Sequence, residues 1–312
     1  MRPREALLTS HRPVLLAEVI ACLKPRPGGR YIDATVGGGG HAEALLHASA
    51  PDGMLLGLDV DALAVARAAS RLVPFGARAT CIQAGFDELS AVAEAHSFSP
   101  CDGILFDLGF SSDQLADPER GFSFQQEGRL DMRFDPSSGQ SAADLVNRLS
   151  QEDLAGILFR YGEEQRARAI ARAIVRRRPL RTTTELAEVV LQAVGRQRGR
   201  IHPATRTFMA LRIAVNRELE QLTLALPQAL DLLSAGGRLA VITFHSLEDR
   251  IVKEFMQREA RACICPPGMP VCTCRHQPRL RMITPMPITP SAAESTDNPR
   301  ARSAKMRVAE RI

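Results

Sequence analysis

A run of four glycines, Gly37 to Gly40, lies between an apolar segment and a segment rich in alanine and leucine. The apolar segment 31–35 predicts a strand, and the segment 41–48 predicts a helix. Glycines at such a junction let the backbone turn with positive φ and come close to a ligand. The next apolar segment ends in Asp59, and an acid at that point suits hydrogen bonds to ribose hydroxyls. This order of residues predicts a site for a nucleotide-like cofactor.

More than one cofactor fits the glycine run. Gly37, Gly39 and Ala42 match the G-x-G-x-x-A spacing of dinucleotide-binding loops, so NAD is an alternative to S-adenosylmethionine. A glycine-rich turn without a ligand is a third interpretation. Four glycines in a row have a large conformational entropy in the unfolded chain, however, and a plain turn does not require them. A ligand site is therefore the favoured interpretation.

Predicted strands and helices alternate from Arg30 to Leu108. Such alternation is typical of right-handed crossovers and of a doubly wound, mainly parallel α/β sheet with ligands at the carboxyl ends of its strands. The glycine run, Asp59 and Asp107 all fall at those ends. The predicted strands are 31–35, 54–58, 79–83 and 103–108, and the predicted helices are 41–48, 62–72 and 89–96.

The alternation stops after Gly109 and resumes with the buried apolar segment 236–244. The sequence between these points is typical of helices. Ser150, with Asp153 three residues later, predicts a helix start with a capping box, and Thr184 predicts a second start.

The clearest helix begins at Pro203, because a missing N–H group is harmless in the first turn. Its apolar residues recur at steps of three and four as far as Leu222 and define a buried face. Arg206, Arg212 and Arg217 fall mostly off that face, so we expect them to point elsewhere.

The simplest architecture is an α/β domain formed by residues 1–112 and 216–312, interrupted by a helical insert at 113–215 that contacts the substrate. The segment 263–302 is rich in Pro, Cys, Ser and Thr, and we expect it to be mobile or to order only on a substrate. The final segment 305–310 alternates like a strand and is expected to pair at the sheet edge.

Positive charge is concentrated in the predicted insert. The whole chain has a net charge of +5, but residues 160–217 contain fourteen arginines and four glutamates, which gives this segment +10 and the remainder −5. This asymmetry favours a polyanionic partner, with RNA or DNA as the first candidates. The alternative is a solvated helical surface in a protein that uses arginine in place of lysine.

The sequence has no apolar run of membrane-spanning length and no apolar stretch at its N-terminus, so we expect a cytoplasmic protein. Disulfides are therefore disfavoured for its cysteines. Cys263, Cys265, Cys272 and Cys274 form the pattern C-x-C-x6-C-x-C, for which a structural zinc and a thiol-lined loop are both open interpretations. No metal is assigned to the predicted cofactor site.

The fourth predicted strand separates the two cofactor interpretations. It delivers the single carboxylate Asp107 after an apolar run, as a methyltransferase requires. A hydride-transfer enzyme would place His, Lys or Tyr near the substrate carbonyl, and none of these follows this strand. Phe86, after the third strand, is well placed to face an adenine. The alternatives are a structural acid for Asp107 and an ordinary core ring for Phe86.

Six ordered motifs follow: DLGFSSDQL at 107–115, RGFSF at 120–124, LDMR at 130–133, YGEE at 161–164, HPATRTF at 202–208 and FHSLEDR at 244–250. Together they resemble the bacterial ribosomal RNA small-subunit methyltransferase H family. The likeness runs from His11 to about Phe255 and returns at 298–311. Phe110 and Arg129 depart from the Val and Pro common in the family, and 263–290 matches only loosely.

The resemblance implies a class I S-adenosylmethionine-dependent methyltransferase fold with an inserted all-helical domain. It also implies methylation of the N4 amino group of a cytosine in the decoding region of 16S ribosomal RNA, with S-adenosyl-L-methionine as donor and 16S ribosomal RNA or the small ribosomal subunit as partner. The cofactor residues that it implies are Gly39, Gly40, His41, Asp59, Phe86, Asp107 and Gln114.

Asp107 is also the expected catalytic residue. The lone pair of the cytosine amino group is delocalised into the ring, so we expect Asp107, or a carbonyl next to it, to accept a hydrogen bond from that group. We expect Phe110 to stack on the target base, with a packing role as the alternative.

Three other functions are weighed against this one. They are an NAD-dependent oxidoreductase, a non-catalytic ribosomal RNA-binding assembly factor, and a DNA amino-methyltransferase, which would show an Asn/Asp/Ser-Pro-Pro-Tyr motif where residues 107–110 stand. The sequence leaves the oligomeric state open.

Overall fold

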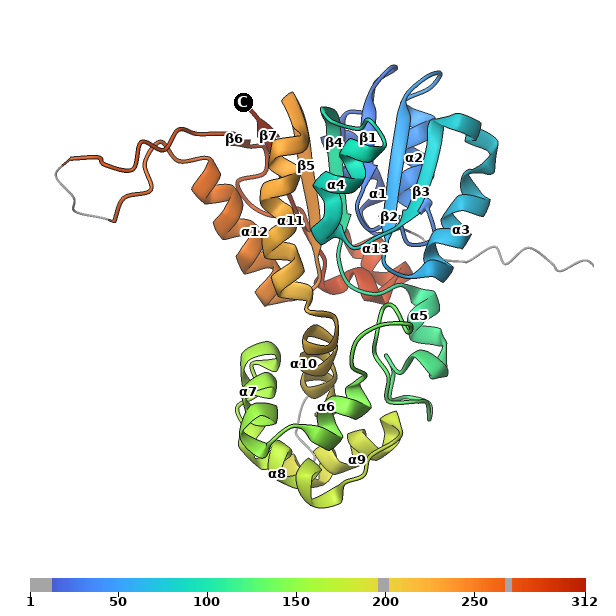
Figure 1. The fold of residues 1–312 in the computed structure, drawn as a ribbon, viewed down its shortest axis with the longest axis vertical. Helices are drawn as coiled ribbons and strands as arrows, with labels where there is room; N and C mark the ends of the chain where they lie inside the picture. Colours follow the sequence, from blue (N-terminus) through green and yellow to red (C-terminus); the bar gives the residue numbers. More distant parts are fainter. Residues whose placement is uncertain (1–12, 196–201, 267–270) are drawn as a thin grey trace, which may run out of the picture. The chain divides into compact units, whose positions relative to one another are not determined.

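The computed structural model describes residues 13–195, 202–266 and 271–312 (Figure 1). The chain divides into two compact units, one formed by Met1–Gly109 with Leu219–Ile312 and the other by Phe110–Glu218. The domain boundaries expected from the sequence lie within a few residues of these divisions. Each unit is described by itself below.

The first unit is built on one sheet, with seven strands among the described residues in the order β3-β2-β1-β4-β5-β7-β6 (Figure 1). Strands β1 to β5 pair in parallel with one another, whereas β7 is antiparallel to both β5 and β6. This arrangement confirms the predicted mainly parallel, doubly wound sheet. The strands are β1 Arg30–Asp33, β2 Met54–Asp59, β3 Ala79–Gln83, β4 Cys101–Asp107, β5 Leu233–Thr243, β6 Leu280–Met282 and β7 Lys305–Arg311.

Both faces of this sheet are buried, because successive residues of the central strands enter different cores. In β4, Ile104 and Phe106 belong to one apolar cluster, whereas Leu105 belongs to another. Such two-sided burial is why the strands appear in the sequence as continuous apolar runs. The helices of this unit are α1 Leu16–Leu23, α2 Gly40–Ala48, α3 Ala62–Leu72, α4 Leu89–Ala95, α11 Glu218–Leu232, α12 Ser246–Glu259 and α13 Ala292–Asp297.

The second unit is helical and has its own apolar core, which includes Leu154, Ile170, Leu186 and Leu211. Ser150 caps one of its helices as predicted, accepting a hydrogen bond from the N–H of Asp153 at 3.0 Å. The helices are α5 Ser112–Ala116, α6 Ala142–Arg148, α7 Gln151–Gly162, α8 Ala167–Arg177, α9 Thr183–Val194 and α10 Ala204–Asn216. No helix of the described residues is long and apolar enough to cross a membrane.

The start of α9 differs from the prediction. Thr182, and not Thr184, is the N-cap, and its hydroxyl accepts a hydrogen bond from the N–H of Glu185 at 3.3 Å. Glu185 in turn accepts a hydrogen bond from the N–H of Thr182 at 3.1 Å. A capping box needs its acid three residues after the cap, and in the run of three threonines only Thr182 has Glu at that distance.

The prediction of one long helix from Pro203 to Leu222 is wrong. It breaks at Arg217, which has the left-handed φ of 51°, so α10 ends and α11 begins there. The expectation that Arg212 points away from the buried face is also wrong, because Arg212 is 8% exposed. Its guanidinium donates two hydrogen bonds to the Glu218 carboxylate, at 2.8 and 2.9 Å, which offset its desolvation.

The C-terminal region is more regular than expected. Strand β6 and helix α13 both fall within 263–302, and β7 lies between β5 and β6, so it is not the edge strand as predicted. Leu280 of β6 is only 1% exposed, and its burial stabilises this short strand in the sheet. The part of this expectation that concerns 267–270 lies outside the described residues.

Candidate functional site

The glycine run forms a tight loop between β1 and α2. Gly37 and Gly39 have φ values of 51° and 80°, in the left-handed region that favours glycine. A Cβ atom on Gly39 would lie 3.2 Å from the Cα of Ala68, and one on Gly40 would lie 2.4 Å from the Cγ of Pro13. Two of the predicted cofactor residues are therefore also required for packing, and they bring the amino end of α2, a favourable place for a negatively charged group, to the end of β1.

Asp59, at the end of β2, holds this loop from the other side. One of its carboxylate oxygens accepts a hydrogen bond from the N–H of Gly37 at 2.9 Å, and the other accepts one from the N–H of Asp61, also at 2.9 Å. Asp59 thus shapes the glycine loop, and its binding to a ribose stays a prediction.

Asp107 ends β4, and its environment favours the protonated form. Burial, together with the negative charges of Asp33 and Glu248, raises the pKa of Asp107 to about 8. Its Oδ1 atom is buried and has no hydrogen-bond partner among the described residues. A buried acceptor of this kind is costly unless a ligand supplies a donor, so this carboxyl group marks a candidate binding position.

His41 lies beside this carboxyl group in the first turn of α2. Its Nδ1 atom is 3.6 Å from Oδ2 of Asp107, and its Nε2 atom is 2.9 Å from the carbonyl oxygen of Val14. The carbonyl can only accept, so Nε2 carries a proton and Nδ1 faces the carboxyl group. The structure thus brings together two of the predicted residues from segments far apart in the sequence.

Asp33, which was not among the predicted site residues, ends β1 and is 1% exposed. Burial, and then the charge of Asp59, raises the pKa of Asp33 to about 7, although its Oδ1 accepts a hydrogen bond from the N–H of Thr35 at 3.2 Å. The hydroxyl of Thr35 accepts a hydrogen bond from the N–H of Asp107 at 2.6 Å. An acid inside the first predicted strand, four residues before Gly37, was the available signal.

Glu248 was also missed, although it lies in the FHSLEDR motif. It is 2% exposed and accepts hydrogen bonds from the N–H groups of Phe244 at 2.8 Å and His245 at 3.3 Å. His245 caps α12, with Nδ1 accepting a hydrogen bond from the N–H of Glu248 at 3.4 Å. The H-x-x-E spacing of this capping box was the available signal for Glu248. The effect of Glu248 on the pKa of Asp107, however, arises only because the fold brings the two residues together.

The last two predicted residues lie in different units. Phe86 follows β3 and packs edge to face on Phe106 with ring centroids 5.7 Å apart, so part of the ring belongs to the core. Gln114 lies in α5 of the second unit, where it is 7% exposed and forms a capping box with Ser111. The other six predicted residues all belong to the first unit.

The aromatic rings of the second unit form a stacked series. Phe110 stacks on Phe122, and Phe122 stacks on Phe134, with centroid separations of 5.5 Å in both pairs. The Arg212 guanidinium lies 4.9 Å from the centroid of Phe110. Phe110 is thus engaged in packing, which is the alternative that the sequence left open for it.

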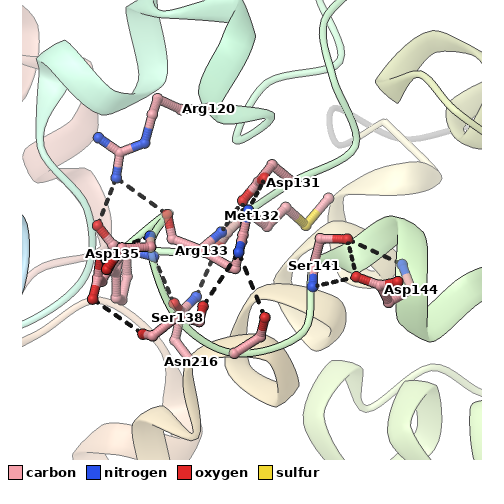
Figure 2. A network of polar contacts seen from close by, with 12 residues as sticks. Arg120, Asp131, Met132, Arg133, Asp135, Ser138, Ser141, Asp144 and Asn216 are labelled. Atoms are coloured by element: carbon pink, nitrogen blue, oxygen red, sulfur yellow. Dashed lines mark hydrogen bonds and ion pairs between the residues drawn. The ribbon is translucent and has the colours of Figure 1, made fainter.

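A polar network fixes the loop that carries the LDMR motif (Figure 2). Asn216 donates a hydrogen bond to the carbonyl of Met132 and accepts one from the N–H of Phe134, both at 2.7 Å. Arg120 donates to the carbonyl oxygens of Arg133 and Phe134 at 3.1 and 2.8 Å. Met132 itself has the left-handed φ of 65°, so these bonds hold a strained backbone in place.

Helix α8 presents a row of exposed arginines, Arg168, Arg172 and Arg176, spaced by four residues. Its opposite face buries Ile170 and Ile174 in the core of the second unit. Because the row lies on one helix face, its charges act together on a polyanion. This face is the candidate nucleic-acid surface of the second unit.

Comparison with known proteins gives a family. Residues 8–312 match the model of the MraW methylase family. Proteins named ribosomal RNA small subunit methyltransferase H from Thermomicrobium roseum and Dehalococcoides mccartyi are 58% and 55% identical to this chain. These matches cover 99% and 97% of this chain and 95% and 86% of the two relatives. The chain therefore belongs to the MraW methylase family.

Proposed function

We propose that this protein transfers a methyl group from S-adenosyl-L-methionine to the N4 amino group of a cytosine in the decoding region of 16S ribosomal RNA. The family makes the chain a methylase, and its relatives are named for the small-subunit RNA. The unpartnered buried oxygen of Asp107, at the end of β4 and next to the first turn of α2, is the observation that carries the proposal.

The charge of the site supports a cationic donor. Asp33 and Glu248 are buried and lie close enough to the half-buried Asp107 for their charges to raise its pKa. A sulfonium or ammonium group would relieve this repulsion, whereas the pyrophosphate of a dinucleotide would add to it. Together with the methylase family, this disfavours the NAD-dependent oxidoreductase that the glycine spacing allowed.

The chain's own residues would hold the donor as follows. Asp59 binds ribose hydroxyls, Phe86 lies along the adenine, and the loop with Gly39 and Gly40 passes beneath the amino-acid end. His41 completes the set in the first unit, and the role of Gln114, which lies in the second unit, stays a prediction. When bound, S-adenosylmethionine supplies an electrophilic methyl carbon.

Asp107 orients the acceptor. A positive charge nearby lowers the pKa of a carboxyl group, so donor binding favours the ionised form of Asp107. The carboxylate then accepts a hydrogen bond from the cytosine amino group and shifts electron density toward its nitrogen. The methylated nitrogen is strongly acidic, so it loses its proton without a powerful general base. Alignment of this kind is worth about 7–11 kcal/mol in well-oriented intramolecular reactions.

The second unit supplies the RNA contact in this proposal. The arginine row of α8 is exposed and belongs to the segment 160–217, which has a net charge of +10 while the rest of the chain has −5. Exposed arginines neutralise phosphates and fix the register of an RNA without reading its sequence. Ribosomal RNA as substrate also places the activity in the cytoplasm.

The deciding experiment uses small ribosomal subunits from a strain that lacks the gene. The protein and S-adenosylmethionine are added, and the new methyl group is located by mass spectrometry of RNA fragments. We expect one methyl group on a cytosine amino nitrogen. A methyl group on a ribose oxygen or a uridine carbon would reject the assignment, and binding without methyl transfer would favour a non-catalytic assembly factor.

A further inference from the structure

Four cysteines come together in the segment between α12 and β6. Cys263 and Cys265 follow the helix, whereas Cys272 and Cys274 precede the strand. Their four Sγ atoms all lie within 4.8 Å of one another. This cluster belongs to the first unit and has no part in the mechanism proposed above.

The base of the segment is closed by hydrogen bonds that bring its two halves together. The N–H of Arg279 donates to the carbonyl oxygen of Glu259 at 2.7 Å, and Nε2 of His276 lies 3.1 Å from the carbonyl oxygen of Arg258. Helix α12 and strand β6 thus present the two C-x-C pairs to each other. The convergence of the thiols follows from the fold, because the pairs are separated by six residues in the sequence.

The spacing of the sulfur atoms fits four ligands of one ion. Cys272 lies 3.5 Å from both Cys263 and Cys274, and Cys263 lies 3.8 Å from Cys274. A disulfide would require about 2.05 Å. Thiolates placed tetrahedrally around zinc, with bonds of about 2.3 Å, lie about 3.8 Å apart. All three measured separations are close to the second value and far from the first.

Backbone N–H groups are directed at the sulfur atoms. The N–H of Cys265 donates to the Sγ of Cys263 at 3.4 Å, and the N–H of Ile264 donates to the Sγ of Cys274 at 3.5 Å. Such bonds stabilise negative charge on sulfur and orient metal ligands. The first of these bonds lies within one half of the segment, and the second joins the two halves.

Hydrophobic burial does not explain why these thiols converge. Cys263 and Cys272 are exposed, and the neighbouring apolar side chains Ile264 and Val271 are 36% and 69% exposed. A segment without a core of its own needs a cross-link to hold a fixed shape. A metal ion supplies this cross-link in a reducing compartment, where disulfides do not persist.

We propose that Cys263, Cys265, Cys272 and Cys274 bind one zinc ion as a tetrahedral, four-thiolate structural site. An all-sulfur donor set selects zinc over magnesium or calcium. Four protein ligands leave no open position, so the ion stabilises the segment and activates no water. On binding, the thiols release their protons to the buffer, and no bond is oxidised or reduced.

The experiment measures the metal content of the full-length protein, purified without disulfide-forming conditions and dialysed against metal-free buffer. We expect one zinc ion per chain by elemental analysis. Replacement of zinc by cobalt should give the visible absorption and the sulfur-to-cobalt charge transfer of a tetrahedral thiolate complex. Neither readout depends on methyl transfer, so failure here is separable from failure of the proposed function.

Matched variants identify the ligands. Cys263→Ser and Cys274→Ser should each lose bound zinc, whereas Cys22→Ser and Cys81→Ser, which alter thiols outside the cluster, should keep it. Thermal unfolding monitored by circular dichroism verifies that each variant is folded. If a ligand variant does not fold, thiol titration of the wild type replaces it, and zinc release should expose four additional reactive thiols.

Several results would overturn the proposal. They are protein that holds no zinc even after reconstitution, a mass that shows disulfides among the four cysteines of freshly reduced protein, bound iron with broad visible absorption, or full zinc content in Cys263→Ser.

Discussion

Two groups of charged side chains in this protein are arranged in opposite ways. At the ends of β1 and β4 in the first unit, Asp33 and Asp107 lie near other acids, and their pKa values are raised to about 7 and about 8. In the second unit, Arg212 and Glu218 are buried as a bidentate ion pair. Uncompensated acids are costly in a folded protein and are typical of reactive sites, whereas paired charges fix a shape. The acids at the strand ends are thus suited to chemistry, whereas the ion pair is suited to holding a fixed shape.

The largest effect is expected from breaking the paired charges. Arg212→Met leaves the Glu218 carboxylate buried without its cation, and such a change costs about 3–5 kcal/mol. Urea unfolding should show a loss of this size. Arg206→Met, on the same helix but exposed, is the control and should stay within about 0.5 kcal/mol of the wild type. A small loss for Arg212→Met would mean that the pair contributes little.

The next effect concerns the acids whose pKa values are raised. Asp107→Ala and Asp107→Asn should reduce single-turnover methyl transfer by about 100-fold to 1000-fold, the range found when one stabilising polar group is removed from an active site. RNA affinity should be unchanged. Asp102→Asn, near the other end of β4, is the control. Near wild-type rates in both Asp107 variants would show that this carboxyl group does not orient the acceptor.

A smaller effect is expected at the arginine row of α8. Charge reversal of Arg168, Arg172 and Arg176 should weaken RNA binding at all salt concentrations. The slope of log affinity against log salt should become shallower by about one for each lost phosphate contact. Affinity for S-adenosylmethionine should not change. Unaltered RNA binding would place the contact surface elsewhere.

The last comparison concerns how stability depends on pH. A carboxyl group whose pKa is raised on folding binds more protons in the native state, so its contribution to the free energy of unfolding falls as pH rises from about 4 to about 8. Asp107→Asn removes one such group. The free energy of unfolding of this variant, taken relative to the wild type, should therefore be higher at pH 8 than at pH 5. Urea unfolding at both pH values measures this. If the free energies of unfolding of the variant and the wild type differ by the same amount at both pH values, the raised pKa of Asp107 is contradicted.

Much of the first unit could be predicted from the sequence. Strands buried on both faces appear as continuous apolar runs, and parallel strands end at one edge, so Asp59 and Asp107 could be placed together. Asp33 and Glu248 could not be predicted as part of the site in this way. They act by raising the pKa of Asp107, which is distant from both in the sequence.

The second unit was harder to predict for a physical reason. Helical periodicity shows which residues share a face, but it does not show where a chain leaves the helix. Arg217 has a left-handed backbone without being glycine, so the break between α10 and α11 gave no signal. Arg212 was expected to face solvent for the same reason, since its partner Glu218 lies beyond that break.

The two hydrogen bonds of Asp59 have a consequence for how donor binding can be detected. In the proposed site, a ribose at the end of β2 would share one carboxylate oxygen of Asp59 with the Gly37 amide, so a bound nucleoside would alter the hydrogen bond of that amide. The exchange rate of the Gly37 amide hydrogen with deuterium would then report on nucleoside occupancy, even with substrate analogues that cannot react.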